Sequence, residues 1–215
     1  NEEEIKLKRS IKGTTMNVVV YCGSNPGNNT NYAKAALELG AWIGDSGNTL
    51  VYGGSSVGLM GLISRVVLEH GGEVYGVEPQ FFIDAGVEQQ DLTELYVVEN
   101  MSERKAKMIE LGDVFVALPG GVGTLEEISE IMSRIRLHLT PGPCFCLDID
   151  GFYEPLHQLI ENMHEHDFIE HWDKDAFQFP KTVEGLIEGL SKWHPDGVFD
   201  GRPIVPEKQE LLMFG

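Results

Sequence analysis

The chain contains few cysteines and no apolar run long enough to cross a membrane. A membrane-spanning helix needs about 20 consecutive apolar residues, whereas the longest runs here are short segments such as Val114–Leu118. Three cysteines, Cys22, Cys144 and Cys146, make a poor disulfide framework for a chain of 215 residues. We therefore expect a protein with no membrane partner, in a reducing, cytoplasmic setting.

Positive charge is also scarce. Lys and Arg number 16 against 34 Asp and Glu, which gives a formal net charge of −18. Such a field repels a long polyanion, so nucleic acid is not expected as the main partner. A small phosphorylated ligand needs only a local positive spot, which a helix N-terminus and one or two arginines supply. The acidic start, Asn1–Glu4, lacks the basic-then-apolar layout of a signal peptide.

What the chain does have is a regular alternation of short apolar runs and helical patterns. Apolar runs predict strands at Met16–Cys22, Thr49–Tyr52, Val74–Val77, Leu95–Val98, Asp113–Leu118 and Cys144–Ile149, with a further short candidate near residues 177–179. Helical spacing predicts helices at Asn31–Asp45, Leu59–His70, Met101–Leu111, Phe152–Glu165 and about Val183–Trp193, and a helix with one face formed by Ile128, Ile131, Ile135 and Leu139. We predict a single α/β, Rossmann-like domain with a mostly parallel sheet of six or seven strands and helices on both faces.

Composition divides the chain into three parts. The charge run Glu2–Arg9 predicts a flexible, solvated leader over residues 1–13. Residues 14–195 carry the alternation and form the expected domain. Residues 196–215, which are rich in glycine and proline, are expected to form a C-terminal tail.

Three glycine-rich turns follow predicted strands. They are Cys22-Gly23-Ser24, Tyr52-Gly53-Gly54-Ser55 and Pro119-Gly120-Gly121-Val122-Gly123-Thr124. Ligands of open α/β sheets bind beyond the carboxyl ends of the strands, which is where all three turns would lie. Glycine lets backbone N–H groups approach an anion, and a following helix N-terminus favours negative charge. One such turn is often only steric, but the three together predict a phosphate site, with Ser24, Gly54 and Ser55 beside it.

The residues after the densest turn allow two interpretations. Thr124 and Glu127 have the spacing of a capping box, in which Thr124 is the N-cap and Glu127 satisfies backbone donors. Spacing alone favours this structural interpretation. A carboxylate beside a bound anion costs electrostatic energy, however, so a phosphate here implies another role for Glu126 or Glu127.

Two adjacent cations, Arg104 and Lys105, lie in the first turns of the helix predicted at Met101–Leu111, where Asn100 and Glu103 read as a capping box. Cations are disfavoured at helix N-termini. The residues alone leave open whether the pair is solvated or serves a ligand at the same edge of the sheet.

The segment Met101–Lys105 followed by Pro119–Glu127 resembles the paired Arg-Lys and Pro-Gly-Gly-x-Gly-Thr-x-x-Glu motifs of the LONELY GUY family. These are cytokinin riboside 5′-monophosphate phosphoribohydrolases, long labelled lysine decarboxylases. The resemblance covers about residues 16–190 and includes Gly53-Gly54-Ser55. It implies hydrolysis of the N-glycosidic bond of a cytokinin-type or adenine nucleoside 5′-monophosphate to free base and ribose 5-phosphate, with neither a metal nor an organic cofactor.

The resemblance also implies roles for individual residues. Arg104 and Glu127 match the catalytic pair, Lys105 matches a substrate-contacting lysine, and Ser133 stands where the family has a substrate-contacting threonine. Phosphate or substrate binding is implied for Gly120, Gly121, Val122, Gly123, Thr124 and Glu126. Family members are typically homodimers with sites near the subunit interface.

Two features depart from the family pattern. The run Arg134–His138 replaces the Trp-Ala-Gln-Leu-Gly of plant members, which leaves the preferred base open. An acidic residue expected around Glu88 cannot be placed, because the register of the loop 84–92 is uncertain.

Other functions are also compatible with parts of the sequence. Molybdenum-cofactor carriers share a similar fold and loop, so a non-catalytic nucleotide or molybdenum-cofactor binding protein is the alternative. The presence of both Arg104 and Glu127 favours the enzyme, because a carrier needs the phosphate cradle but not the carboxylate. A pyridoxal-phosphate decarboxylase is disfavoured, because no lysine has a convincing Schiff-base setting. The histidines at 164, 166 and 171 fit no zinc spacing, and no metal site is expected.

Overall fold

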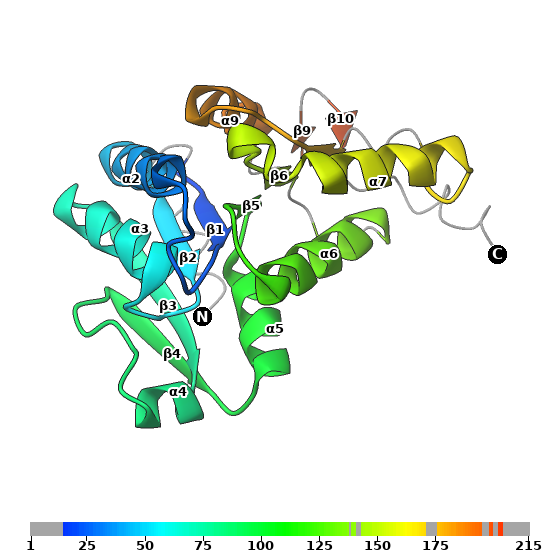
Figure 1. Ribbon diagram of the computed structural model, residues 1–215. Coiled ribbons are helices and arrows are strands. Elements are labelled where there is room, and N and C mark those ends of the chain that lie inside the picture. The colour runs from blue at the N-terminus through cyan, green and yellow to red at the C-terminus, as the bar shows by residue number, and fades with distance from the viewer. Residues whose placement is uncertain are drawn as a thin grey trace.

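The computed structural model describes residues 15–137, 139–140, 143–170, 176–194, 198–199 and 202–203. The predicted leader, His138, His171 and most of the predicted tail lie outside these residues. The strands of the main sheet are β1 (Asn17–Tyr21), β2 (Thr49–Tyr52), β3 (Glu73–Pro79), β4 (Glu94–Val98), β5 (Val114–Ala117), β6 (Cys144–Cys146) and β7 (Phe177–Gln178). The helices are α2 (Thr30–Asp45), α3 (Gly58–Glu69), α4 (Gln80–Asp84), α5 (Met101–Leu111), α6 (Val122–Arg136), η1 (Ile149–Gly151), α7 (Glu154–Glu165) and α9 (Val183–Leu190) (Figure 1).

The seven strands form one parallel sheet in the order β4-β3-β2-β1-β5-β6-β7. The chain fills one half of the sheet from β1 to β4 and the other half from β5 to β7. Strands β1 and β5 are therefore neighbours, with Val20 opposite Val116 and Tyr21 opposite Ala117. Strand order reverses between them, which opens a crevice at their carboxyl ends. The prediction of a Rossmann-like α/β fold is confirmed.

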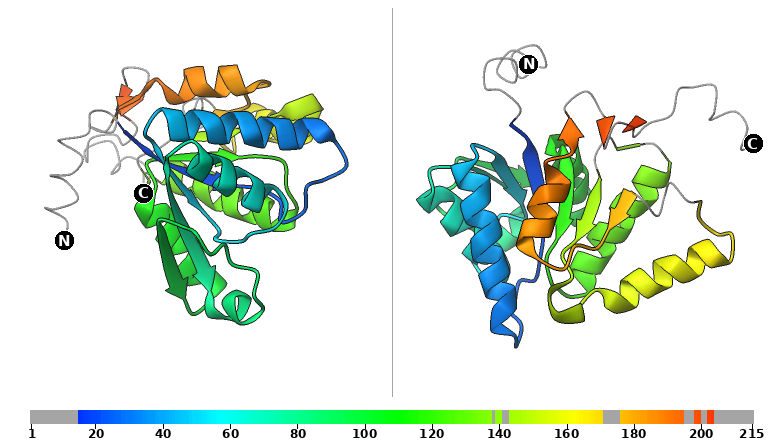
Figure 2. Two further views of the ribbon diagram at one scale, coloured as in Figure 1. Left: turned by 90° about the vertical axis from the view of Figure 1, so that its left-hand side faces the viewer. Right: turned by 90° about the horizontal axis from the view of Figure 1, so that it is seen from above.

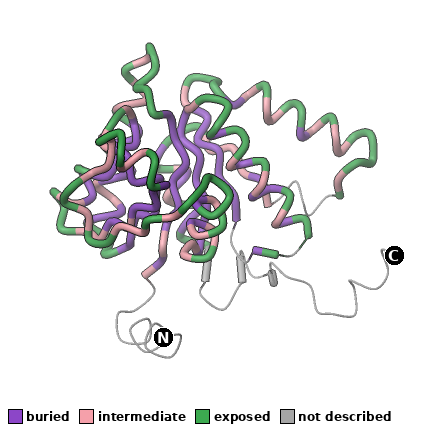
Figure 3. Tube along the Cα trace, turned by 90° about the horizontal axis from the view of Figure 1, so that it is seen from below, coloured by how far each residue is buried: buried purple, intermediate pink, exposed green. Residues whose placement is uncertain are grey.

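Helices cover both faces of this sheet because side chains of a strand alternate between its faces. Val18 and Val20 of β1 belong to a core cluster shared with α2, α3 and α9. Val19 and Tyr21 point the other way, into a second cluster with α5, α6 and α7. Figure 2 shows α2 and α9 side by side on one face. The buried segments in Figure 3 run through the central strands, and the outer faces of the helices are exposed.

Several predicted boundaries were wrong. Helix α6 ends at Arg136, so Leu139 leaves the row of Ile128, Ile131 and Ile135 and is 63% exposed instead of buried. The predicted strand Cys144–Ile149 ends at Cys146, and residues 149–151 form a 3-10 turn. The predicted final helix stops at Leu190. The short helix α4 was not predicted at all.

The region after α9 contributes a small antiparallel sheet. Its strands are β8 (Trp193–His194), β9 (Val198–Phe199) and β10 (Arg202–Pro203), in the order β10-β9-β8. The first falls where the sequence predicted the end of a helix, and the other two fall in the predicted tail.

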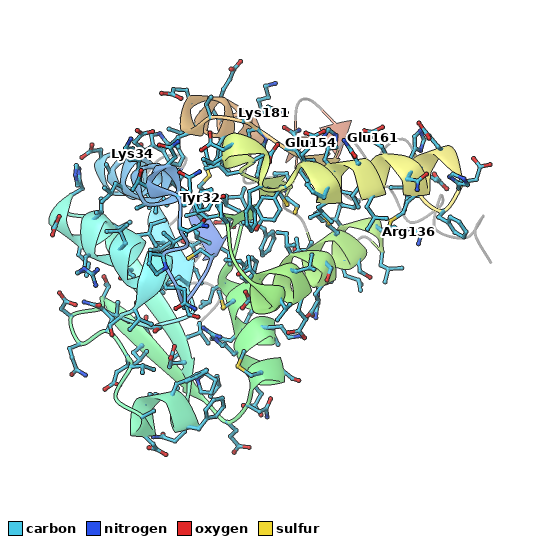
Figure 4. All side chains as sticks on the ribbon, viewed as in Figure 1. Tyr32, Lys34, Arg136, Glu154, Glu161 and Lys181 are labelled. Atoms are coloured by element: carbon cyan, nitrogen blue, oxygen red, sulfur yellow. The ribbon has the colours of Figure 1, made fainter. Side chains whose placement is uncertain are left out.

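Surface charge is partly neutralised by ion pairs at a distance from the crevice. Lys181 contacts Glu154 at 3.2 Å, at the start of α7 (Figure 4). In the described part of the chain, no helix is both long and apolar enough to span a bilayer. The same residues contain no group of three or more His, Cys, Asp or Glu side chains arranged to hold a metal ion.

Candidate active site

A pocket of about 410 Å³ lies at the carboxyl ends of the central strands. All three glycine-rich turns contribute to its wall, through Gly23 and Ser24, Gly53 and Ser55, and Gly121 and Gly123. The first and third turns are tied together, since the N–H of Gly23 donates to the carbonyl of Pro119 at 3.1 Å. The prediction that the three turns meet at one edge of the sheet is confirmed.

The third turn leads directly into α6, which begins earlier than the sequence indicated. Gly121 is the N-cap residue, and no side chain caps the helix. The first intrahelical bond runs from the N–H of Leu125 to the carbonyl of Gly121, at 3.1 Å. The N–H groups of the preceding residues therefore have no acceptor within the helix. A Cβ on Gly121 or Gly123 would meet nothing within 4 Å, so the approach to these groups is open.

The capping-box interpretation of Thr124 and Glu127 is wrong. Thr124 lies inside α6, is 4% exposed, and packs so closely on Gly120 that a Cβ there would overlap its hydroxyl. Thr124 thus fixes the turn against the helix instead of capping it. Glu127, freed from any capping role, lines the pocket.

Arg104 is held rigidly inside the pocket wall, although it starts from the first turn of α5. Its Nε donates to the carbonyl of Val77 at 3.0 Å, and its Nη2 donates to the carbonyl of Gly53 at 2.8 Å. A Cβ at Gly53 would collide with this guanidinium, so any larger residue there would displace Arg104. The buried cation is tolerated at a helix start because backbone carbonyls of β3 and of the turn after β2 solvate it.

The predicted N-cap Asn100 of α5 is confirmed, although Glu103 reaches back to the residue before it. The side chain of Asn100 accepts from the N–H of Glu103 at 3.0 Å, and Glu103 accepts from the N–H of Glu99 at 3.0 Å. These contacts fix the helix start and hence the direction of Arg104.

Glu127 is a half-buried carboxyl with an unusual acidity. Burial raises its pKa to about 7, and the nearby charge of Glu126 adds to the rise. The charges of Arg104 and Lys105 oppose the shift without cancelling it. At neutral pH the group therefore exchanges protons readily, as a general acid or base requires.

A second carboxyl, Glu78, was missed by sequence reasoning. It lies near the end of β3, lines the pocket and is 1% exposed. Its Oε2 is 4.0 Å from Nη2 of Arg104 and has no hydrogen-bond partner among the described residues. Burial raises its pKa to about 7; Arg104 opposes this rise and Glu88 adds to it. The available signal was an acidic residue directly after an apolar run, at the ligand edge of the sheet.

Some predicted site residues lie outside the pocket lining. Lys105 pairs with Glu126 at 2.6 Å and with Glu130 at 3.1 Å, so its charge is neutralised beside the pocket. Of the three, only Glu126 lines the pocket. Ser133 is exposed on α6, away from the lining residues.

The structure also places the loop 84–92, whose register the sequence did not determine. Glu88 forms an isolated antiparallel bridge with Ser55. The N–H of Ser56 donates to the carbonyl of Val87 at 2.8 Å, and the N–H of Gln89 donates to that of Gly54 at 2.9 Å. The loop after α4 is thereby joined to the second glycine turn.

Much of the remaining wall is apolar. Side chains from α3, α4, α5 and the loop after α4 contribute Met60, Phe82, Val87, Met101 and Met108 to it. Apolar and thioether side chains of this kind suit a flat ring, whereas the turns and charged groups suit a phosphorylated sugar.

Comparisons with known proteins identify the family of the chain. Residues 60–190 match the family described as "Possible lysine decarboxylase". Over 185 residues the chain is 42% identical to the cytokinin riboside 5′-monophosphate phosphoribohydrolase of Rhodococcoides fascians, covering 86% of this chain and 93% of that protein. It is 38% identical over 179 residues to the enzyme of the same name, LOG, from Oryza sativa subsp. japonica, covering 83% and 74%.

Solved structures with the same fold include molybdenum-cofactor proteins. The molybdenum cofactor binding protein of Rippkaea orientalis aligns with a TM-score of 0.63 at 19% identity, covering 82% of this chain and 96% of that one. The Moco carrier protein of Chlamydomonas reinhardtii aligns with a TM-score of 0.64 at 20% identity and the same coverage. At such identities the likeness concerns the fold alone.

The sequence relatives are closer, and their similarity extends over most of the chain. The family match also covers more than half of it. The chain therefore belongs to the LONELY GUY (LOG) family.

Proposed function

We propose that this protein hydrolyses the N-glycosidic bond of a cytokinin-type or adenine nucleoside 5′-monophosphate, releasing the free base and ribose 5-phosphate. The observation that carries the proposal is the meeting of Arg104, Glu127 and three glycine-rich turns in one pocket. Relatives that are named for this activity match the chain along most of its length. No metal or organic cofactor takes part in the proposed reaction.

The 5′-phosphate binds at the start of α6. The support is an uncapped helix N-terminus with open space at Gly121 and Gly123. Free N–H groups and the positive end of the helix dipole favour an anion there. Ser24 and Ser55 line the same pocket from the other two turns. Anchoring the phosphate converts remote binding energy into alignment of the ribose.

Glu127 acts on the ribose. Cleavage of a ribosyl C–N bond passes through an oxocarbenium-like transition state, as in other glycoside hydrolyses. The carboxylate of Glu127 accepts a proton from water, and the hydroxyl adds to C1′ while positive charge on the sugar is stabilised. Arg104 is the fixed cation that keeps part of Glu127 ionised and orients the sugar or its phosphate.

The proposal extends to the assembly and the compartment. A homodimer with sites near the interface is supported by exposed apolar side chains beside the pocket, where Val122 is 87% exposed and Leu125 is 47% exposed. A cytoplasmic location is supported by three free, buried cysteines, which suit a reducing compartment.

One experiment separates an enzyme from a carrier. The protein is incubated with a panel of nucleoside 5′-monophosphates, including AMP and isopentenyladenosine monophosphate, and the free base is measured by chromatography. Base release by the wild type, absent from Glu127→Gln, supports the hydrolase. Tight nucleotide binding without release of any base would reject it in favour of a non-catalytic nucleotide or molybdenum-cofactor binding protein.

A further inference from the structure

We propose that Glu78 is the acid that protonates the leaving base, a catalytic residue outside the two sequence motifs of the family. The inference rests on the proposed hydrolysis of a nucleotide and adds a role that Glu127 and Arg104 leave unfilled. A purine anion is a poor leaving group, so breaking its bond to ribose needs a proton delivered to the ring.

The strand order places Glu78 at the base end of a bound nucleotide. The phosphate cradle follows β5, and Glu78 lies near the end of β3. Two strands, β1 and β2, lie between them, which separates β5 from β3 by about 14 Å at roughly 4.8 Å per strand. The base is the part of a nucleotide farthest from its 5′-phosphate. A nucleotide that spans the pocket therefore carries its base toward Glu78.

The carboxyl of Glu78 lacks, at one of its oxygens, a hydrogen-bond partner from the residues that the structure describes. Its Oε2 is buried and has no hydrogen-bond partner in the described part of the chain. Leaving such a group without a partner costs stability, so its persistence in a pocket wall calls for a ligand. Gly54 makes room for it: its φ is +83°, and a Cβ there would lie 2.5 Å from Oε2 of Glu78. The second glycine turn thus shelters a carboxyl in addition to contacting the ligand space.

Apolar side chains surround the same end of the pocket. Phe82 and Val87 follow β3 in the chain, and Met60 packs at Gly53 beside Arg104. These groups offer flat, water-excluding contacts to a purine ring. A proton donor inside such a wall delivers its proton to the ring instead of losing it to bulk water.

Charges that face Glu78 keep it available as an acid near neutral pH. Burial is the main cause that raises its pKa to about 7, Arg104 of α5 lowers it, and Glu88 of the adjoining loop raises it. Tyr52 of β2 also faces it, but the pKa of that hydroxyl is raised well above its usual value, so it stays neutral. Glu78 is therefore partly protonated at pH 7 and can donate.

The proposed step balances in atoms and charge. The C1′–N9 bond breaks, its electron pair moves to the base, and the proton of Glu78 passes to a ring nitrogen. Water supplies hydroxyl to C1′ and a proton to Glu127. The products are neutral base and ribose 5-phosphate. Glu127 then releases its proton to solvent, and the deprotonated Glu78 takes one up from solvent.

A pair of substrates tests the role. AMP needs a protonated leaving group, whereas 4-nitrophenyl β-D-ribofuranoside 5-phosphate releases nitrophenolate, which needs no proton. We expect Glu78→Gln to lower kcat/KM for AMP by about 100-fold or more, the size of a general-acid contribution, and to change the nitrophenyl substrate little. Glu127→Gln is expected to lose both activities. Glu73→Gln, the same substitution at the opposite end of β3, is the matched control and should keep both.

The outcomes distinguish this inference from the proposed function. An equal loss on both substrates, or no loss on AMP, would overturn the role of Glu78. A wild type inactive on both would reject the hydrolase itself.

The wild type supplies a second measurement that needs no variant. With AMP, kcat/KM should fall as pH rises through about 7 and Glu78 loses its proton; with the nitrophenyl substrate this alkaline limb should be missing. An alkaline limb of the same position with both substrates would contradict the proposal.

Discussion

At the scale of single residues, Arg104 is the group around which the pocket chemistry is arranged. Its charge lowers the pKa of both Glu78 and Glu127, yet burial outweighs it at each, and both carboxyls titrate near pH 7. The two pKa values alone cannot assign acid and base. Position does: Glu127 follows the phosphate turn, and Glu78 lies three strands away.

Replacing the carboxyl of Glu127 separates catalysis from binding. Glu127→Gln keeps the shape of the side chain but cannot accept a proton, so we expect nucleotide binding to persist and turnover to fall by about 100-fold or more. In the wild type, activity should fall as pH drops below about 7, because the base must be ionised to act. Calorimetric titration of AMP and pH-dependent kinetics are the measurements. Near-normal turnover in the variant would remove Glu127 from the mechanism.

Ionisation of Glu78 should also lower the free energy of unfolding. Its pKa is raised from 4.5 in the unfolded chain to about 7 in the folded one, so the cost is absent below the lower value and complete above the higher. Glu78→Gln removes it. We expect Tm to rise by several degrees at pH 8 and to change little at pH 4.5. Thermal unfolding at the two pH values checks this, and a variant less stable at pH 8 would indicate a structural carboxylate.

The resemblance to the family motifs selected Arg104 and Glu127, and the structure places both in the lining of one pocket. Glu78 could not be selected in the same way. Its burial depends on Gly54 of another strand's turn, and its acidity depends on Arg104, 26 positions later. A local pattern does not contain such contacts.

At the scale of elements, the start of α6 is the difference between prediction and structure that most affects the candidate site. Thr124 and Glu127 matched a capping box by spacing, but the backbone turns into the helix at Gly121, with no side-chain cap. Glycines decided the start because they allow the chain to fold tightly between β5 and α6, and Thr124 packs behind them. The proposed phosphate cradle would thus consist of backbone N–H groups, with Thr124 packed behind them.

The uncapped start of α6 allows a direct test of the proposed phosphate anchor. Adenosine offers no anion to the N–H groups of this turn, so we expect its kcat/KM to be lower than that of AMP by a factor of 100 or more, about 3 kcal/mol of lost binding to the transition state. Steady-state rates on the two substrates provide the check, with added inorganic phosphate as a control for partial rescue. Equal rates would exclude a phosphate anchor.

Strands and long helices were predictable because buried apolar runs and helical spacing are local signals. The short helix α4 and the loop after it were not. The loop is positioned by backbone bonds to residues more than 30 positions earlier, such as that from the N–H of Ser56 to the carbonyl of Val87. The same distance in sequence explains why Glu88 could not be placed in advance.

At the scale of the whole molecule, the strand order decides where chemistry is done. Neighbouring β1 and β5 bring the first and third turns together, and β2 and β3 extend the pocket toward Glu78. The predicted alternation of strands and helices implied such an edge but did not specify which turns would be adjacent. Only the order of strands does that.

The assembly can be tested with a matched pair of surface variants. Leu125 of α6 stands between the lining residues Thr124 and Glu126 and is 47% exposed, whereas Leu159 belongs to α7, which contributes no residue to the lining, and is 49% exposed. We expect the wild type to have twice the chain mass, Leu125→Glu to be monomeric, and Leu159→Glu to remain a dimer. Sedimentation velocity measures all three. A wild-type monomer would refute the proposed homodimer.

The backbone hydrogen bonds between the second glycine turn and the loop after α4 have a consequence for how base preference can evolve. Val87 lines the part of the wall that we assign to the base, and backbone hydrogen bonds join Val87 to Ser56 and Gln89 to Gly54. A substitution that reshapes this wall for a bulkier base would also move the turn beside Glu78. We therefore expect changes of base selectivity in this wall to change the rate as well.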